Sequence, residues 1–341
     1  MNSDRFAQIT AAYPRLRVAI VGDICLDRYL EIDPARQEIS IETGLPVHNV
    51  VNVRSQPGAA GTILNNLVAL GVGAIFPVGF CGEDGEGFEL QRVLQAKRGV
   101  QSDGFFATPD RRTFTYCKPL VLHSGRAPQE LSRLDSKNWS ATPPAVEDRV
   151  IAALKQLSAQ VDAIIVMDQV DVAETGVVTR RVLEAIGELA RQRPQLLILA
   201  DSRRGLKNYP PVTFKMNAAE LGALTGTGPD APLDSLKQTA GKLARGHGRN
   251  VFVTLSERGM VGATPAGEVE HVPTFPLRGE IDIVGAGDAV TANLTASLAA
   301  GAGVREALEI ANAAASIVIH QLGTTGTASV TQIGGLLGAE K

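Results

Sequence analysis

Short apolar runs alternate with longer amphipathic stretches through most of this chain. Residues 17–22 read as a buried strand ended by Gly22, and residues 163–167 and 196–200 repeat that pattern. Helices are predicted at 57–70, 84–96, 146–157, 175–191, 289–298 and 306–320, and further strands at 251–254, 260–263 and 268–272. This alternation predicts parallel βαβ units and therefore an α/β fold.

Two strand-like segments stand apart from that pattern. Residues 47–53 and 113–122 alternate like half-exposed strands, and prolines 34 and 46 interrupt the sequence before the first of them. We expect them to form a small β lid on the main sheet, built from segments at about 25–56 and 110–124. The length of 341 residues fits one large α/β domain with such an appendage, or two domains.

Composition narrows the class of protein. The chain is 44% hydrophobic and 20% charged, with a net charge of -3, which is ordinary for a globular protein. It lacks a basic block, and it lacks an apolar run long enough for a membrane span, so we expect neither a nucleic-acid nor a membrane partner. Residues 1–15 are polar and mixed, so we do not expect them to act as a signal peptide. The three cysteines are widely spaced, without zinc spacing, so we expect reduced thiols and a cytoplasmic location.

A glycine-rich stretch, residues 282–288, leads directly into an apolar helix. The start of a helix leaves backbone N–H groups unpaired, and the helix dipole favours an anion there. Gly285 and Gly287 allow a phosphate to approach the backbone closely. Asp288 would then be placed to take a proton from an attacking hydroxyl. The alternative is that Asp288 only caps the helix.

Polar residues also follow the predicted strands. Asp23 and Asp27 follow the first strand, and residues 168–171 and 201–205 follow two later ones. Ligands of open α/β sheets bind at these strand ends. The alternative is a set of solvated turns.

Asn217 and Glu220 lie three residues apart at a predicted helix start. They share one face and can order Mg²⁺-bound water and nucleotide phosphates, because Mg²⁺ keeps several waters and needs few carboxylates. They also fit a capping box, and both readings can hold together.

Several cations lie between residues 111 and 135, namely Arg111, Arg112, Lys118, Arg126 and Arg133. A phosphorylated acceptor would need such a cation, ideally a guanidinium. The alternative is that most of them are solvated surface residues.

Four sequence strings together resemble a known family. They are D-x-x-G-A-G-D at 282–288, G-x-x-G-x-D-x-x-G at 79–87, N-x-x-E at 217–220 and G-D-x-x-L-D-R-Y at 22–29. The chain resembles the PfkB, or ribokinase-like, carbohydrate kinases from about residue 17 to 329. The last string and R-L-D at 133–135 are similar to the D-glycero-D-manno-heptose 7-phosphate kinase branch. We expect no room for the nucleotidyltransferase domain that bifunctional members of that branch carry.

The resemblance implies a single ribokinase-like kinase domain, 1–341, with a Rossmann-like sheet and a β lid. It implies ATP-dependent transfer of a phosphoryl group to a sugar or sugar phosphate, with Mg²⁺ and a candidate K⁺ site, in a homodimer formed through the lid.

The implied catalytic residues are Asp288 as base and Gly285, Ala286 and Gly287 as anion hole. The implied nucleotide-side residues are Asn217, Glu220 (Mg²⁺ through water), Thr254, Ser256, Gly259 and Asn312. The implied acceptor residues are Asp27, Gly58, Thr62, Arg133 and Arg203, and Asp282 is the candidate K⁺ region.

Some positions depart from the family pattern, namely Ala59, Thr62, Val170, Ser256 and Ile283. Asn66, one helical turn after Thr62, could replace a sugar-binding amide, although we expect an exposed helix residue. These departures keep two alternatives open. One is a non-catalytic sugar or nucleotide sensor on a kinase fold, and the other is a nucleoside kinase of the same fold.

Overall fold

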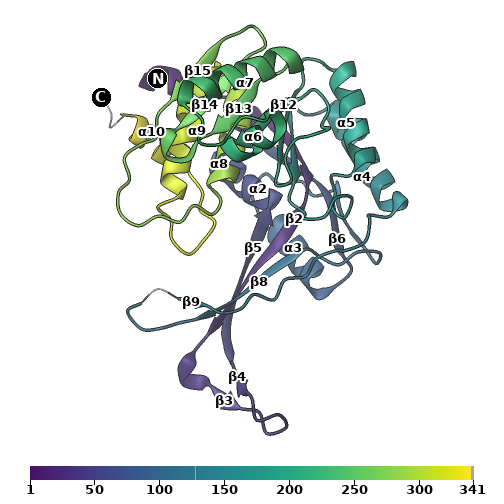
Figure 1. Cartoon of the computed structure of the whole chain (residues 1–341). Helices are drawn as coiled ribbons and strands as arrows, with labels where there is room; N and C mark the ends of the chain where they lie inside the picture. Colours follow the sequence, from purple (N-terminus) through teal and green to yellow (C-terminus); the bar gives the residue numbers. More distant parts are fainter. Residues whose placement is uncertain (127, 339–341) are drawn as a thin grey trace.

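The computed structural model describes residues 1–126 and 128–338, and its centre is a nine-stranded sheet of order β15-β14-β13-β12-β11-β10-β1-β6-β7 (Figure 1). Its parallel strands are β1 (Arg17–Gly22), β6 (Ala74–Gly82), β7 (Phe105–Thr108), β10 (Ala163–Asp168), β11 (Leu197–Ser202), β12 (Thr213–Asn217) and β13 (Val251–Thr254). The antiparallel strands β14 (Met260–Ala263) and β15 (Val269–Val272) complete one edge. The predicted α/β class with a mostly parallel sheet is confirmed.

Helices cover both faces of this sheet. One face carries α4 (Pro144–Ser158), α5 (Arg180–Gln192), α6 (Ala218–Thr225) and α7 (Leu233–His247). The other carries α1 (Ser3–Thr10), α2 (Ala60–Ala69), α3 (Gly85–Gln95), α8 (Ala286–Ala299), α9 (Val304–Val318) and α10 (Val330–Gly338). Along β1, Ala19 and Val21 face the first layer, whereas Val18 and Ile20 face the second. Burial on both faces explains why the central strands are continuous apolar runs.

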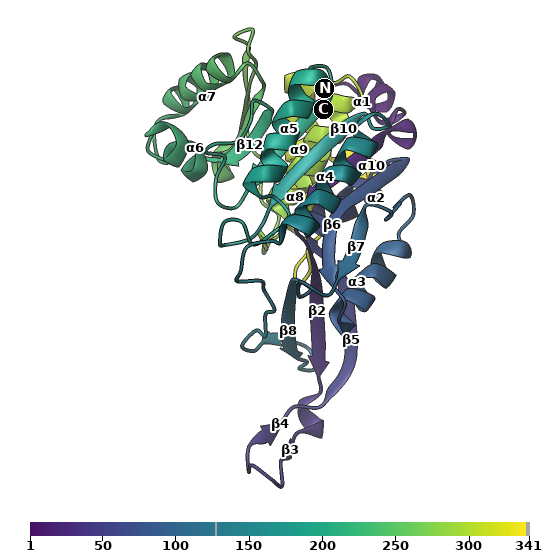
Figure 2. The ribbon, with the colours of Figure 1, turned by 90° about the vertical axis from the view of Figure 1, so that its right-hand side faces the viewer.

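A second, four-stranded sheet of order β5-β2-β8-β9 extends away from the main body (Figures 1 and 2). It consists of β2 (Ile24–Ile32), β5 (Val50–Ala59), β8 (Thr115–Val121) and β9 (Gln129–Glu130), and the hairpin of β3 (Glu38–Ile39) and β4 (Pro46–Val47) forms its tip. Because β2 follows β1 after one residue, Asp23, the junction of the two sheets lies beside the end of β1.

The ends of β1 and β10 define the crevice of the main sheet. From β1 the chain first adds β6 and β7 on one side, and then returns to add β10, β11, β12 and β13 on the other. Such a change of direction opens a crevice at the carboxyl ends of the two adjacent strands, where α/β sheets bind ligands.

Some element boundaries differ from the sequence prediction. The helix predicted from residue 57 begins at Ala60, because Pro57, Gly58 and Ala59 still pair with β2. The helix predicted from residue 175 begins at Arg180, because the Thr179 side chain caps it at the Val182 N–H. Elements α1, α7, α10, β6 and β7 had no sequence prediction.

Two composition-based predictions can be compared with the structure. Cys25, Cys81 and Cys117 all lie in the described part and are buried free thiols. Among the described residues, no helix is both long and apolar enough to cross a membrane.

Candidate active site

The glycine-rich stretch forms an open turn at the start of α8. Gly285 precedes the helix in a left-handed conformation (φ 84°), and within the described chain no side chain caps this helix. The Ala286 N–H donates to the Ile283 carbonyl at 3.2 Å, so the turn itself uses that donor. The N–H groups of Gly287 and Asp288 lie in the first helical turn, where no helical acceptor precedes them. We call this turn, residues 285–288, the cradle.

Asp288 is partly exposed. Burial raises the pKa of Asp288 to about 7, the negative charges of Asp201 and Asp27 raise it too, and Lys215 opposes them. The group can therefore hold or release a proton near neutral pH, which a general base requires. The negative charge of Asp27 acts on Asp288, so the two carboxyl groups lie near each other.

A buried ion pair lies beneath the cradle. The Lys215 amine donates to the Asp201 carboxylate at 2.7 Å, and Thr291 Oγ1 donates to the same oxygen at 2.8 Å. Only 8% of either charged side chain is exposed. A Cβ on Gly287 would lie 3.1 Å from the Lys215 amine, so this glycine lets the cradle approach the positive charge. Sequence reasoning missed this pair, although both residues lie in the carboxyl-terminal part of adjacent parallel strands.

The carboxylate of Asp27 lies on β2 with only 3% of the residue exposed. A Cβ on Gly58 would lie 2.6 Å from the Asp27 carboxyl carbon, so glycine is required at that position. Burial raises the pKa of Asp27, against the opposing charges of Lys118 and Arg133. Thr62 is buried, and its methyl group would lie 3.5 Å from a Cβ on Gly285, so it packs toward the cradle.

Four cations lie near Asp27 or near Tyr116, its neighbour on β8. The Lys118 amine lies 3.9 Å from Asp27 Oδ1. The Arg133 guanidinium lies 4.4 Å from the centre of the Tyr116 ring, and the Lys137 amine lies 5.7 Å from it. Arg203 is close enough to influence the pKa of Tyr116. We call these four cations, Lys118, Arg133, Lys137 and Arg203, the positive border.

Arg111 has a different role from the other candidate cations. It is buried, and its guanidinium donates to the backbone carbonyls of Ser140, Ala141 and Thr175. It therefore ties backbone segments together.

Asn217 and Glu220, two of the residues predicted to bind on the nucleotide side, form the capping box of α6. The Asn217 side chain accepts from the Glu220 N–H at 2.9 Å, and Glu220 accepts from the Asn217 N–H at 2.8 Å. Thr254 is the neighbour of Asn217 on β13. Burial raises the pKa of Glu220, and Lys215 and Asp201 are near enough to act on it. Asn312 is buried and donates to the Pro273 carbonyl at 2.7 Å.

Two departures from the family pattern keep a glycine-like backbone. Ala59 has φ 55° and Ser256 has φ 52°, both in the left-handed region, and Gly259 follows at φ 87°. Each non-glycine residue accepts a strain of about 1–2 kcal/mol to hold that shape. The turns therefore keep their course although the glycines are replaced.

Asn66 does not behave as predicted. It is fully buried, and its amide donates to the Thr62 carbonyl at 3.0 Å and to the Gly326 carbonyl at 3.4 Å. The expectation of an exposed helix residue was wrong, because α2 is buried against the rest of the chain and the segment at Gly326 lies against Asn66.

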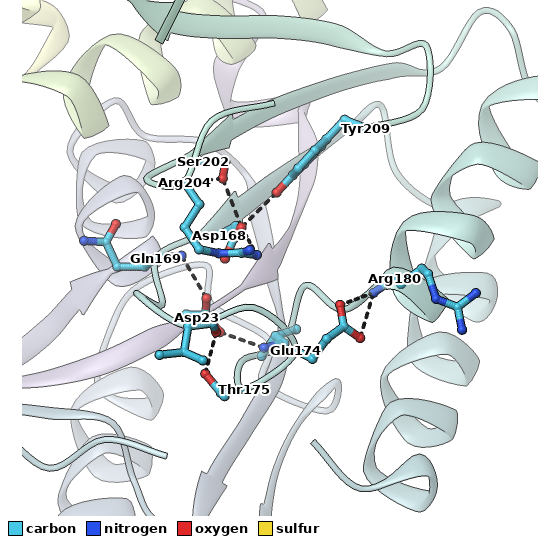
Figure 3. Close-up of polar contacts among 11 residues, drawn as sticks. Asp23, Asp168, Gln169, Glu174, Thr175, Arg180, Ser202, Arg204 and Tyr209 are labelled. Carbon is cyan, nitrogen blue, oxygen red and sulfur yellow. Dashed lines mark hydrogen bonds and ion pairs between the residues drawn. The ribbon is translucent and has the colours of Figure 1, made fainter. Parts of the chain in front are cut away.

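A polar network fixes the segment that follows β10 (Figure 3). Asp168 Oδ2 accepts from Ser202, Arg204 and Tyr209, at 3.0, 2.6 and 3.1 Å. Asp23 accepts from the Gln169 N–H at 2.8 Å and from the Val177 N–H at 2.7 Å. Burial and the charge of Asp168 raise the pKa of Asp23 to about 6. These residues hold both ends of the segment 169–177.

Asp282 lies beside the cradle and stays partly exposed. Its carboxylate accepts from the Val284 N–H at 3.0 Å, and its own N–H donates to the Ile319 carbonyl at 2.7 Å. Ile283, one of the departures from the family pattern, is 73% exposed and makes the surface beside Asp282 apolar.

Known proteins are similar to this chain over most of its length. A family model described as pfkB family carbohydrate kinase matches residues 17–331. A protein named "Bifunctional protein HldE" from Bradyrhizobium sp. (strain ORS 278) is 31% identical over 330 residues, which is 96% of this chain and 64% of that protein. A protein of the same name from Rhodospirillum rubrum is 32% identical over 322 residues, which is 93% of this chain and 62% of that protein. This chain thus spans less than two thirds of these relatives.

Solved structures share the fold. Ribokinase of Arabidopsis thaliana, complexed with ribose and ATP, matches with a TM-score of 0.66 and 17% identity over 94% of this chain and 98% of its own. Phosphofructokinase-2 of Escherichia coli, in complex with substrates and products, matches with a TM-score of 0.70 and 16% identity over 95% of this chain and 99% of its own. The chain has a ribokinase-like fold.

Proposed function

Because this chain belongs to the pfkB family of carbohydrate kinases, we propose that it transfers the terminal phosphoryl group of ATP to a hydroxyl of a sugar phosphate. One observation carries the proposal. Asp288 has a pKa near 7, lies in the first turn of a helix with free N–H donors, and is within electrostatic reach of the buried acceptor candidate Asp27.

In this proposal Asp288 accepts the proton of the attacking hydroxyl. The N–H groups of Gly287 and Asp288 donate to the charge that spreads over the transferring phosphoryl, and the helix dipole adds to their effect. Asp27 binds sugar hydroxyls and orients the acceptor toward Asp288. Gly58 lets strand β5 pass close to the Asp27 carboxylate. Thr62 packs against the cradle and supports it.

The positive border favours a phosphorylated acceptor over a neutral one. Arg133, Lys137 and Arg203 lie near Tyr116. Lys118 lies at Asp27, the neighbour of Tyr116 in the small sheet. Guanidinium and ammonium groups bind phosphate by charge-assisted hydrogen bonds. The resemblance of residues 22–29 and 133–135 to heptose-phosphate kinases supports the same acceptor class.

ATP would lie on the side of β12 and β13, with Thr254, Ser256, Gly259 and Asn312 along its path. Among the described residues, no group of three or more His, Cys, Asp or Glu side chains could hold a metal alone. This fits Mg²⁺ carried by nucleotide phosphates and water, with Asn217 and Glu220 orienting that water. When bound, Mg²⁺ would neutralise phosphate charge. Asp282 is our candidate for a K⁺ site.

A coupled ADP-release assay tests the function. Sugars, sugar phosphates and nucleosides are offered with Mg-ATP, and we expect turnover with sugar phosphates. Turnover only with nucleosides would favour a nucleoside kinase. Ligand-induced thermal stabilisation without phosphate transfer to any acceptor would favour a sensor.

The rate should depend on pH in a defined direction. Because Asp288 must be ionised to accept a proton and its pKa is about 7, kcat/KM should rise as the pH increases through 7. Below that value the carboxyl is protonated and the rate should fall about tenfold per pH unit. The assay is repeated from pH 5.5 to 8.5, and a flat profile between 6 and 8 would contradict the role of Asp288.

We also propose that the small sheet is a lid and a dimer contact. Its edge strand β5 carries exposed Val50, Val51 and Val53, and the tip carries Ile39 and Ile41, the latter 99% exposed. An exposed apolar edge strand is a template for pairing. A second copy of this chain would cover the surface and hold the lid for closure over the acceptor.

Light scattering during gel filtration should show two chains per particle. Ile41→Glu should shift the mass toward one chain, because the charge cannot be buried at low cost. Leu277→Glu, at a 63% exposed apolar residue between β15 and α8, is the control and should leave the mass unchanged. A monomeric wild-type protein at micromolar concentration would reject this contact.

A further inference from the structure

Asp171 forms ion pairs with two cations of the positive border, Lys137 and Arg203. The Lys137 amine donates to Asp171 Oδ2 at 2.8 Å, and the Arg203 guanidinium lies 3.2 Å from Asp171 Oδ1. The hydrogen bond from Lys137 lowers the pKa of Asp171, so the group is a carboxylate at neutral pH. One carboxylate therefore bridges two positive groups from different parts of the chain.

These ion pairs are open to solvent. The side chains are 25% exposed at Lys137, 42% at Asp171 and 52% at Arg203. Exposed pairs of this kind contribute little to folding stability. A ligand arriving from solvent can reach all three groups, and a small anion can replace the carboxylate between the cations.

The two ion pairs of Asp171 lie beside the proposed acceptor site. The Lys137 amine lies over the ring of Tyr116, and Tyr116 is the neighbour of Asp27. Asp171, Lys137, Arg112 and Trp139 line one narrow pocket, with Asp23 also in its lining. A phosphate on an acceptor that reaches Asp27 would meet the same two cations.

The backbone on either side of Asp171 is fixed. Asp23 accepts hydrogen bonds from the N–H groups of Gln169 and Val177, so both ends of this segment are held at the end of β1 (Figure 3). Within that frame the Asp171 side chain can rotate away from the cations without unfolding the sheet.

We infer that Asp171 is a specificity-determining residue that competes with the acceptor's phosphate for Lys137 and Arg203. This inference rests on the proposed function for the identity of the acceptor. A phosphate dianion carries more charge and more acceptor oxygens than a carboxylate, so it displaces Asp171. Breaking the ion pairs of Asp171 costs part of the binding free energy, so Asp171 weakens the binding of every anionic acceptor. A neutral acceptor does not displace Asp171, and its binding is unaffected.

Asp171→Asn tests this role in the full chain. The amide keeps the shape but releases the cations, so the KM of the best sugar phosphate should fall about two- to tenfold with kcat unchanged. The KM of the same sugar without phosphate should not change. Glu184→Gln, which removes an exposed partner of Arg180 on α5, is the matched control and should change neither value.

Calorimetry with inorganic phosphate, in the absence of turnover, separates this inference from the acceptor proposal. Tighter binding of phosphate to Asp171→Asn than to the wild type supports the competitor role, whichever acceptor is used. Equal or weaker binding overturns it and makes Asp171 a residue that holds the two cations in place. A wild type that phosphorylates only neutral sugars would overturn the acceptor class alone.

Discussion

Asp288→Asn should lower kcat by about a hundredfold to ten-thousandfold while the fold stays intact. Asparagine has nearly the same size and shape, but it cannot accept the proton of the attacking hydroxyl. The substitution also removes a carboxyl whose charge is disfavoured by burial and by Asp201 and Asp27. We therefore expect thermal stability equal to or above that of the wild type. The coupled assay and a thermal melt measure both effects.

Asp148→Asn is the matched control. Asp148 lies on α4, is 63% exposed and pairs with Arg181, so its loss should leave kcat near the wild-type value. If Asp288→Asn kept more than half of the wild-type rate, Asp288 could not be the base. If it unfolded, Asp288→Ser would test the same loss with a smaller side chain.

Lys215→Met should destabilise the protein by about 3–5 kcal/mol and impair catalysis as well. The Asp201 carboxylate would remain buried, with Thr291 as its remaining hydrogen-bond donor. The positive charge next to Gly287 would also be lost. Because Lys215 opposes the rise in the pKa of Asp288, the rising limb of the pH profile should move to higher pH. Urea unfolding and the pH profile measure the two consequences.

The double variant Lys215→Met/Asp201→Asn separates stability from catalysis. Removing both charges leaves no uncompensated carboxylate, so much of the stability should return. Catalysis should not return, since the cation under the cradle is still missing. A single Lys215→Met variant within about 1 kcal/mol of the wild type would show that the pair is not the buried network described here.

The central strands were predictable because burial on both faces makes them apolar throughout. The pattern at 17–22, 163–167 and 196–200 led directly to β1, β10 and β11. The start of α2 was not predictable in the same way. Residues 57–59 carry the glycine and proline of a turn, but their pairing with β2 extends the strand to Ala59, and only the tertiary structure supplies that partner.

In the candidate site, too, local features were predictable and contacts between distant residues were not. The string at 282–288 pointed to Asp288 because its chemistry is local, a turn followed by a helix. Lys215 and Asp201 are 14 residues apart and meet only when β11 and β12 pair in parallel. The sequence suggested that Ala59 and Ser256 had lost a function of glycine, but both residues have the positive φ angles that glycine adopts most readily.

The account depends most on the cradle and its neighbouring carboxylate. A crystal structure with ADP, aluminium fluoride, Mg²⁺ and the best acceptor tests it most directly, because the fluoride complex imitates the transferring phosphoryl. We expect the fluorides within about 2.7–3.1 Å of the Gly287 and Asp288 N–H groups, and the acceptor hydroxyl between the complex and the Asp288 carboxylate. A fluoride complex bound away from the start of α8, with Asp288 not contacting the acceptor, would contradict the account.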